Sequence, residues 1–292
     1  MGRKRAWILF LLPSFAGVLV FVVCPFADVV RRSFLTAVTG KFVGLQNYRN
    51  IFQNTAFRTA VKNTFLFTGV CIPLLVALGL LVSLALSGVK RVQLIKSFYL
   101  FPMAMPTAAI VIVWKMLFYR QGFFNKYLVR FLGLVNGELA ADGGECVAPV
   151  DYLGTNAAFF LLVATYIWKN LGYTIVLWLA GIMGLNGEML EAARVDGAGK
   201  WQRLVYVLLP NLKGSLYTIV VLSFLNSFKI YREAYLVAGA YPHESIYMLQ
   251  HLFNNWFVNL DLDKMAAAAV VCGAVFLAGI LFLQHAWDGR EE

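Results

Sequence analysis

Residues 63–89 read NTFLFTGVCIPLLVALGLLVSLALSGV, and no side chain in this stretch carries a charge. A helix that crosses the hydrocarbon core of a bilayer needs roughly 20 mostly apolar residues, because its backbone N–H and C=O groups must be bonded within the segment. Residues 63–89 exceed that length without interruption. The stretch therefore predicts a membrane-spanning helix.

The composition of the whole chain agrees with a membrane protein. Of its 292 residues, 60% are hydrophobic and 14% are charged, whereas soluble domains have roughly 45–50% apolar and 25% charged residues. The net charge is +10, but Lys and Arg lie between the apolar runs and do not form one stripe. We therefore expect the chain to meet membrane lipid and to bind no nucleic acid.

Residues 63–89 are one of six such stretches, and together they predict an all-α fold. The expected architecture is a polytopic transmembrane helical bundle of about six spans, in one domain that covers residues 1–292. The first stretch is longer than the roughly 7–15 apolar residues of a signal peptide, so we expect it to be retained. We place the spans at residues 6–30, 63–89, 97–119, 157–182, 210–236 and 265–287.

Two of these spans contain charges that lipid does not tolerate. Lys169 lies well inside the fourth span, so its side chain must face the protein interior or a wet cavity. The fifth span is uncharged only from Gly214 to Phe228, which is short for a crossing. We expect it to end in protein-lined, partly aqueous surroundings, because three charged residues follow: Lys229, Arg232 and Glu233.

The connections between spans do not orient the array. Cytoplasmic connections usually carry an excess of Lys and Arg. In this chain the two sides are equally basic, largely because of the first connection, Arg31 to Lys62, so the count does not show which side is cytoplasmic. The connection from Gln121 to Asn156 is rich in Gly and acidic residues, which predicts little regular structure. Orientation must come from another feature.

That feature is the segment between the fourth and fifth spans. Residues 191–210 read EAARVDGAGKWQRLVYVLLP, and Asn186 upstream can cap a short helix. Asp196-Gly197 is a turn dipeptide, and apolar residues then recur at helical spacing until Pro210, which we expect to stop the pattern. Residues 186–210 therefore predict helix, sharp turn, helix. A plain solvated connector between two spans is the alternative.

The spacing of this segment resembles the EAA loop of the membrane subunits of binding-protein-dependent ABC importers. That pattern is Glu-Ala-Ala, two residues, Asp-Gly-Ala, and then an apolar stretch that ends in Pro. Leu204 stands where the family usually has Phe. The matching residues are Glu191, Ala192, Ala193, Asp196, Gly197, Ala198 and Pro210.

In that family the segment forms a cytoplasmic coupling helix that fits a cleft on an ATPase subunit, and we call residues 186–210 the coupling loop. The resemblance implies that Gly197 allows the bend and that the alanines permit close approach. Glu191 and Asp196 would offer carboxylates to Arg or Lys of the partner. Alternatively, they make only local helix pairs, Glu191 with Arg194 and Asp196 with Lys200.

Other positions resemble the carbohydrate-uptake branch of the family, which includes the maltose and glycerol-phosphate permeases. They are Gly44-Leu45-Gln46-Asn47-Tyr48, Pro102, Pro106, Trp114, Trp168 and Leu179-Ala180-Gly181. One departure follows the fifth span, where this branch commonly has a Gly-Gly-Pro turn and this chain has Gly239-Ala240-Tyr241-Pro242. The departure indicates an unusual substrate within the branch.

The resemblance implies a permease subunit that forms the pathway for a sugar or oligosaccharide. Its implied partners are an extracytoplasmic solute-binding protein, a second permease subunit that is a paralogue, and cytoplasmic ABC ATPase subunits that bind ATP and Mg. The location would be a prokaryotic plasma (inner) membrane, crossed several times, with both termini cytoplasmic.

Catalytic and metal-binding motifs do not occur in the chain. It has no G-x-x-x-x-G-K-[ST] phosphate loop, no His-Glu-x-x-His and no Gly-x-Ser-x-Gly. We therefore expect no enzyme activity, no catalytic residue and no metal or cofactor in this chain. Composition alone leaves a secondary transporter or a channel of unrelated family as the alternative function.

Polar residues inside the spans are candidates for the substrate pathway, because placing a polar group in lipid costs free energy. Hydrogen bonding between helices is the competing role, which Ser and Asn perform routinely. The candidates are Lys169 and Asn170 in the fourth span, and Ser223, Asn226, Ser227 and Lys229 in the fifth.

Overall fold

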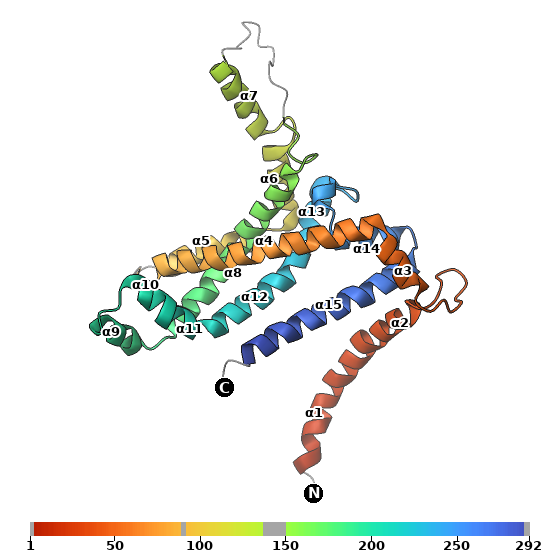
Figure 1. Ribbon diagram of the computed structural model, residues 1–292, viewed down its shortest axis with the longest axis horizontal. Helices are drawn as coiled ribbons and strands as arrows, with labels where there is room; N and C mark the ends of the chain where they lie inside the picture. Colours follow the sequence, from red (N-terminus) through yellow and green to blue (C-terminus); the bar gives the residue numbers. More distant parts are fainter. Residues whose placement is uncertain (1–2, 89–91, 137–149, 289–292) are drawn as a thin grey trace. The chain divides into compact units, whose positions relative to one another are not determined.

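The computed structural model describes residues 3–88, 92–136 and 150–288 (Figure 1). These residues form helices without a β-strand, which confirms the predicted all-α class. The α-helices are α1 (Arg3–Val18), α2 (Cys24–Arg32), α3 (Gln46–Gln53), α4 (Thr55–Leu86), α5 (Val92–Ala104), α6 (Thr107–Phe118), α7 (Phe123–Asn136), α8 (Ala157–Met183), α9 (Gly187–Val195), α10 (Lys200–Gln202), α11 (Leu209–Asn211), α12 (Lys213–Ser227), α13 (Tyr231–Ala238), α14 (Leu249–Val258) and α15 (Leu262–Asp288).

Shorter turns of other helix types join some of these elements. The π-helical turns are Leu19–Val23, between α1 and α2, and Arg203–Leu208, between α10 and α11. The 3-10 turns are Phe228–Ile230, between α12 and α13, and Glu244–Ile246, before α14. Each π-helical turn is followed two residues later by a proline, Pro25 or Pro210. A wider turn relieves the clash between a proline ring and the carbonyl of the preceding turn.

Four helical segments are each long and apolar enough to cross a membrane. They are Leu11–Arg32, Thr55–Leu86, Ala157–Met183 and Leu262–His285. Two bent pairs bring the number to six if each pair is one span, Ser97–Ala104 with Thr107–Leu128 and Lys200–Asn211 with Lys213–Ala238. The spans predicted at 6–30, 63–89, 157–182 and 265–287 thus correspond to helical segments. Their ends lie within five residues of the predicted ends, except that the second begins eight residues earlier, at Thr55.

The span predicted at 97–119 is not one continuous helix. It breaks between α5 and α6, and the two parts meet at 92°. Pro106 is extended, with φ −63° and ψ 139°, and a residue before proline disfavours the helical conformation. The helix therefore ends at Ala104 and restarts at Thr107.

The connection predicted to have little regular structure, 121–156, contains the helix α7. Aromatic side chains supply its contacts: the rings of Phe123 and Tyr127 lie 4.4 Å apart, and Phe124 stacks on Phe118 of α6 at 4.9 Å. The prediction of little regular structure was wrong for this part because it rested on the Gly and acidic residues. Most of those residues fall in 137–149, outside the described residues. The aromatic residues at its start determine the local structure.

Contacts divide the chain into two compact units, one made of residues 1–60 and 252–292 and the other of residues 61–251. In the first unit, α15 packs against α2 and α3. The buried Asn47 side chain donates to the carbonyl oxygens of Ser33 at 3.0 Å and Leu35 at 2.8 Å. This bonding holds the turn that follows α2 against the start of α3.

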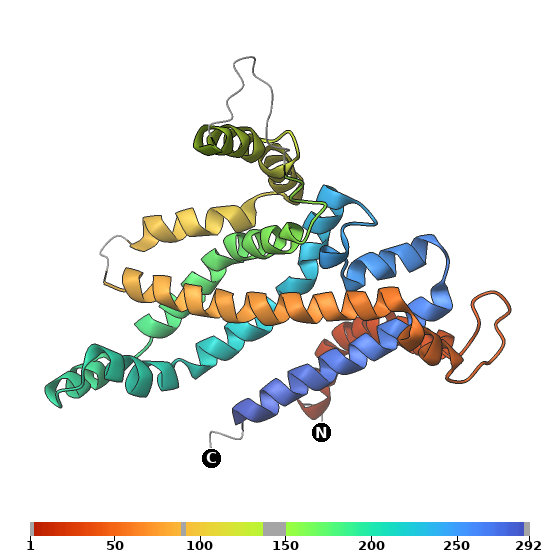
Figure 2. The same cartoon turned by 45° about the horizontal axis from the view of Figure 1, so that its top comes forward.

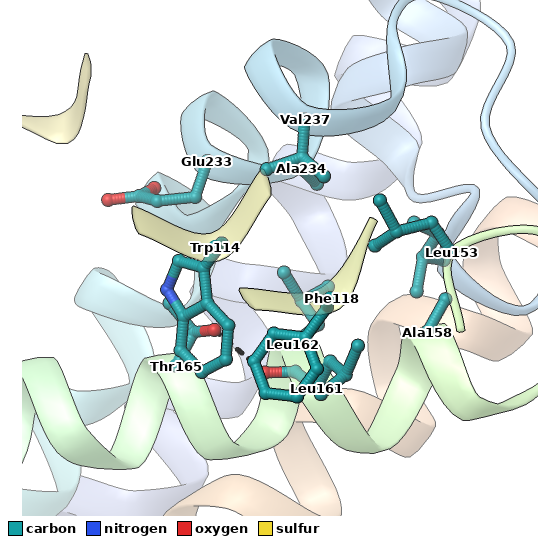
Figure 3. Close-up of a pocket in the computed structure, with 11 residues that line it drawn as sticks. Trp114, Phe118, Leu153, Ala158, Leu161, Leu162, Thr165, Glu233, Ala234 and Val237 are labelled. Atoms are coloured by element: carbon teal, nitrogen blue, oxygen red, sulfur yellow. Dashed lines mark hydrogen bonds between the residues drawn. The ribbon is translucent and has the colours of Figure 1, made fainter. Parts of the chain in front are cut away.

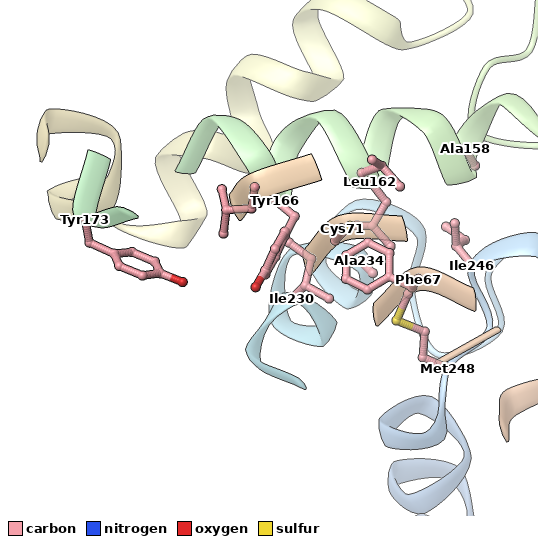
Figure 4. Close-up of a cluster of buried hydrophobic side chains, with 12 residues drawn as sticks. Phe67, Cys71, Ala158, Leu162, Tyr166, Tyr173, Ile230, Ala234, Ile246 and Met248 are labelled. Atoms are coloured by element: carbon pink, nitrogen blue, oxygen red, sulfur yellow. The ribbon is translucent and has the colours of Figure 1, made fainter. Parts of the chain in front are cut away.

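In the second unit, α5 lies along α8, and both views show α4 passing beside α8 (Figure 2). Phe67 and Cys71 of α4 pack against Leu162 and Tyr166 of α8, together with residues from α13 and the segment before α14 (Figure 4). All four side chains are buried. This cluster fixes the α8 face that carries the polar residues described below.

His251 belongs to the same unit and is fully buried. Its Nδ1 accepts a hydrogen bond from the backbone N–H of Met248 at 3.3 Å, and its ring meets that of Tyr231 edge-on at 4.7 Å. Burial lowers the pKa of His251 to about 4. At neutral pH this histidine is therefore an uncharged core residue.

Candidate functional site: coupling loop and polar cavity

The first half of the coupling loop folds as the sequence predicts. Asn186 caps α9, because its side-chain oxygen accepts from the backbone N–H of Glu188 at 3.0 Å. The helix ends at Val195, Asp196 is its C-cap, and Gly197 follows with φ +79°. Glycine suits this position, since residues with a Cβ rarely adopt a positive φ. The backbone N–H of Ala198 then bonds to the carbonyl of Ala193 at 3.0 Å.

The second half departs from the prediction at its end. Pro210 does not stop the helical path, because it lies inside α11, and the break comes at Leu212. The π-helical turn before Pro210 provides the room that its ring needs. Leu212 has φ −92° and ψ 9°, and the chain bends by 69° there before α12 begins.

One side of the coupling loop is anchored to the spans. Leu204 and the buried Leu208 pack with Trp178 of α8 and Ile219 of α12 in an apolar cluster. Leu190 of α9 also contacts this cluster. Both halves of the coupling loop therefore pack against the same parts of α8 and α12.

The other side of the coupling loop is exposed. The side chains of Glu191 and Asp196 are exposed, and neither the Glu191–Arg194 nor the Asp196–Lys200 ion pair forms among the described residues. Three large apolar residues lie on the same segment: Val195, Trp201 and Tyr206, which are 87%, 72% and 76% exposed. Free carboxylates beside exposed apolar side chains form a surface that a protein partner can cover.

A second site lies deeper in the same unit, where a cavity of about 130 Å³ opens between the helices. We call it the polar cavity. It combines one residue of α5, three of α8 and four of the segment from α12 to α13. Its lining residues are Met103, Tyr166, Lys169, Asn170, Asn226, Lys229, Ile230 and Glu233.

An ion pair forms one wall of the polar cavity. Lys169 of α8 bonds to the Glu233 carboxylate of α13, and the side chains are only 21% and 4% exposed. Thr107 of α6 donates to the same carboxylate oxygen at 3.3 Å. A buried carboxylate without such partners would be costly. The pair therefore explains how Lys169 is accommodated inside a span.

Amide and hydroxyl groups form the rest of the polar lining. The buried Asn170 side chain donates to the carbonyl of Tyr166 one turn earlier, at 2.8 Å. Lys229 donates to the amide oxygen of Asn226 at 2.9 Å, and its own side chain is exposed. Of the predicted pathway residues, the structure thus brings Lys169, Asn170, Asn226 and Lys229 to one cavity.

Ser223 and Ser227 are not part of that lining. Both are buried, and Ser223 bonds to α8 through Tyr173, whose hydroxyl lies 2.7 Å from its Oγ, and through Tyr166, which donates to its carbonyl at 2.6 Å. Ser227 lies 3.3 Å from the hydroxyl of Thr68 on α4. In this structure the two serines hold helices together, which is the alternative role that the sequence left open.

An apolar pocket of about 30 Å³, enough for about one water, adjoins the polar cavity. Figure 3 shows Trp114 and Phe118 of α6 beside Thr165 of α8, with Glu233 on the neighbouring helix. The two rings stack at 4.8 Å. Glu233 borders both spaces, and Lys169 and Thr107 bond to its carboxylate.

Four of the lining residues were not among the pathway candidates: Met103, Tyr166, Ile230 and Glu233. In the sequence Glu233 stands out only as a charge that ends the fifth span, and Tyr166 only as an aromatic neighbour of Lys169. A charge of opposite sign in another apolar segment is the usual partner of a lysine inside a span, and that signal pointed to Glu233. The sequence makes Tyr166 compatible with a sugar site, because it lies near Lys169 and Asn170, but Trp168 and Tyr173 are compatible for the same reason.

Comparisons with known proteins identify similar permeases. The chain is 28% identical to the diacetylchitobiose uptake system permease protein NgcF of Streptomyces coelicolor, over 99% of this chain and 85% of that protein. It is 29% identical to the trehalose/maltose transport system permease protein MalF of Thermococcus litoralis, over 92% and 89%.

A solved structure has the same fold. It is a bacterial ABC transporter involved in the import of the acidic polysaccharide alginate, with a TM-score of 0.78, 20% sequence identity, and coverage of 99% of this chain and 98% of that chain. The family described as binding-protein-dependent transport system inner membrane component matches residues 69–290. The chain belongs to this family of inner membrane transport components.

Proposed function

We propose that this chain is the permease subunit that forms the pathway for a carbohydrate in a binding-protein-dependent ABC importer. Family membership supports the transport role and the inner membrane location. The names of its relatives support the substrate class, because one concerns diacetylchitobiose and the other trehalose and maltose. A secondary transporter or channel is not supported, since the matching family works with binding proteins.

The observation that carries the proposal is the exposed side of the coupling loop. Glu191 and Asp196 are available for charge-assisted bonds to Arg or Lys of a partner, and Gly197 makes the bend that presents Asp196. The partner is a cytoplasmic ATPase subunit, which binds ATP and Mg and supplies the hydrolysis that this chain does not perform. The coupling loop then lies in the cytoplasm, and both termini lie there too.

The polar cavity is the substrate-facing part of the proposed pathway. Lys169, Asn170 and Asn226 offer amide and charged groups to sugar hydroxyls, and Tyr166 adds an aromatic wall. Ser223 and Ser227 contribute by holding α12 against its neighbours. Closure of the ATPase subunits moves the coupling loop, and the shared apolar cluster passes that movement to α8 and α12, which both line the cavity.

Two further partners complete the proposed importer. A second permease subunit, a paralogue of this chain, forms the other half of the pathway, and an extracytoplasmic solute-binding protein delivers the sugar. Large apolar side chains on α1 and α2 support contact with lipid or with that second subunit. Among them, Phe15 is 70% exposed and Phe21, in the π-helical turn, is 80% exposed.

Co-purification tests the coupling proposal. The chain is expressed with its neighbouring subunits, and the ATPase retained on the purified permease is measured together with sugar-stimulated hydrolysis. Asp196→Lys should release the ATPase, because it opposes the positive groups that meet the carboxylate. Glu244→Lys, which reverses an exposed carboxylate of the 3-10 turn before α14, is the matched control and should retain it.

The bend is tested in the same assay. Gly197→Trp should abolish coupling, whereas Gly197→Asn should preserve most of it, since asparagine tolerates a positive φ better than other residues with a Cβ. The coupling proposal is wrong if Asp196→Lys and Gly197→Trp both leave an intact, transport-active complex with the ATPase.

A further inference from the structure

The charges that line the polar cavity do not cancel. Among the described residues it has two lysines, Lys169 and Lys229, and one carboxylate, Glu233. Lys169 and Glu233 bond to each other across the α8–α13 contact and so form a neutral pair. One positive charge therefore remains, and it belongs to Lys229.

Lys229 has no carboxylate partner within the described part of the chain. Its ammonium group donates to the neutral amide oxygen of Asn226 at 2.9 Å, which orients the charge without neutralising it. The side chain is exposed and lines the cavity next to Tyr166 and Ile230. The amine is thus held in place and accessible to a molecule that enters.

Such a charge has consequences for the ligand. The cavity is walled by apolar side chains such as Met103 and Ile230, and electrostatic interactions are stronger beside such low-dielectric walls than in open water. A neutral sugar that filled the cavity would remove water from the Lys229 ammonium group and give it no counter-charge, which is costly. A sugar with an anionic group would supply that counter-charge.

We propose that the polar cavity binds a carbohydrate bearing an anionic group, which lies against Lys229 while Asn170, Asn226 and Tyr166 contact the sugar. The inference rests on the proposed function and names its substrate class. A lysine is a compact point charge without the fork geometry of arginine. The site therefore accepts a carboxylate, a phosphate or a sulfonate, and the rest of the sugar provides the discrimination.

The charge of the cavity is measured without knowing the substrate. Met103→Cys places a thiol in the lining, in a background where the native cysteines are replaced by serine, and the whole importer is reconstituted in nanodiscs. Reaction rates with an anionic and a cationic methanethiosulfonate reagent are each divided by the rate with a small thiol in solution. The anionic reagent should be favoured, and Lys229→Gln should lower that preference by about tenfold.

Arg232→Gln is the matched control, because Arg232 is an exposed cation three residues away that does not line the cavity. It should leave the preference unchanged. The inference is overturned if the cationic reagent is favoured, or if Lys229→Gln and Arg232→Gln have equal effects. Neither outcome bears on whether the chain transports carbohydrate.

Uptake then tests the substrate class directly. Proteoliposomes with the complete importer and its binding protein receive digalacturonate, glucose 6-phosphate, sulfoquinovose and the neutral disaccharide galactobiose. We expect at least one acidic sugar to be taken up in preference to galactobiose, and Lys229→Gln to reduce its uptake about tenfold, with Arg232→Gln unchanged. Uptake of galactobiose alone would overturn the inference and leave the proposed function intact. Failure with all four probes, while transport of amino acids or peptides succeeds, would overturn both.

Discussion

At the scale of single residues, the Lys169–Glu233 pair allows two charged side chains to line a cavity between membrane-spanning helices. Both charges are largely removed from water, so each depends on the other. We predict that Lys169→Gln, which leaves the Glu233 carboxylate without its counter-charge, lowers the free energy of unfolding by about 3 kcal/mol. The double variant Lys169→Gln/Glu233→Gln should lose clearly less. Denaturant unfolding of the purified importer measures both.

The control for this cycle is the half-buried pair Lys264–Asp261, which joins at 3.0 Å and is more accessible to water, with both side chains 36% exposed. Lys264→Gln should change the free energy of unfolding by no more than about 1 kcal/mol, the usual value of a pair accessible to water. If Lys169→Gln changes the free energy of unfolding by as little as Lys264→Gln does, or if the double variant is less stable than Lys169→Gln, the two charges do not stabilise each other.

The same pair shows what single residues reveal in a sequence. Lys169 stands in an otherwise apolar span, so its inward orientation could be predicted from the cost of charge in lipid. Glu233 is the acidic residue that follows the fifth span closely, but the sequence did not show whether it lies deep enough to reach Lys169. The depth of a side chain at the end of a span depends on how the helices pack, and helix packing is a tertiary property.

At the scale of elements, the length of the apolar stretches predicted where helices form but did not predict where they break. Residues 63–89 and 157–182 were recognisable because length and lack of charge suffice to identify a spanning helix. The break at Pro106 and the bend at Leu212 depend on local backbone conformation. Other prolines, such as Pro73 inside α4, leave their helix unbroken. The presence of proline alone therefore did not indicate where a span bends.

One contact between elements leads to a further prediction. Gly172 of α8 faces the backbone of α5 so closely that a Cβ would overlap the carbonyl oxygen of Tyr99. Backbone cannot move aside as a flexible side chain can. Gly172→Ala should therefore separate α5 from α8 and lower the free energy of unfolding by about 1–3 kcal/mol, the range found for overpacked interiors.

Gly214→Ala is the control for this substitution. Gly214 also lies in a helix, α12, but no atom lies within 4 Å of the place that a Cβ would occupy there. The replacement should be neutral or stabilise by up to about 1 kcal/mol, because alanine favours helix more than glycine does. Thermal unfolding of the two variants in the same detergent compares them. Equal stability of both would show that α5 and α8 do not touch at Gly172.

At the scale of the whole molecule, composition predicted the membrane and the coupling loop predicted the family. The pattern from Glu191 to Pro210 could be recognised because its small and charged residues stand at fixed spacing within one short segment. The polar cavity could not be predicted as a unit, since its lining comes from α5, α8, and the α12–α13 segment. Residues so far apart in sequence meet only through the packing of whole helices.

The predicted topology is testable on the intact protein. If each bent pair is one span, residues 41 and 155 face the outside and residue 87 faces the cytoplasm, as the coupling loop does. Lys41→Cys and Thr155→Cys should react with a membrane-impermeant thiol reagent in intact spheroplasts. Ser87→Cys should react only after permeabilisation. All three positions are exposed in the structure, so accessibility within the protein does not differ between them.

The position of residue 155 distinguishes a broken span from a re-entrant loop. If the α5–α6 pair enters and leaves on one side, residue 155 faces the same side as residue 87, and Thr155→Cys is protected in intact spheroplasts. Such a result would also invert the predicted side of the coupling loop, because α8 would then cross to the side of residue 41. Labelling of Tyr241→Cys, which replaces a side chain 73% exposed after α13, tests the Lys200–Ala238 pair in the same way. With six crossings, Tyr241→Cys reacts from outside, because the fifth span returns the chain to the side of residue 41.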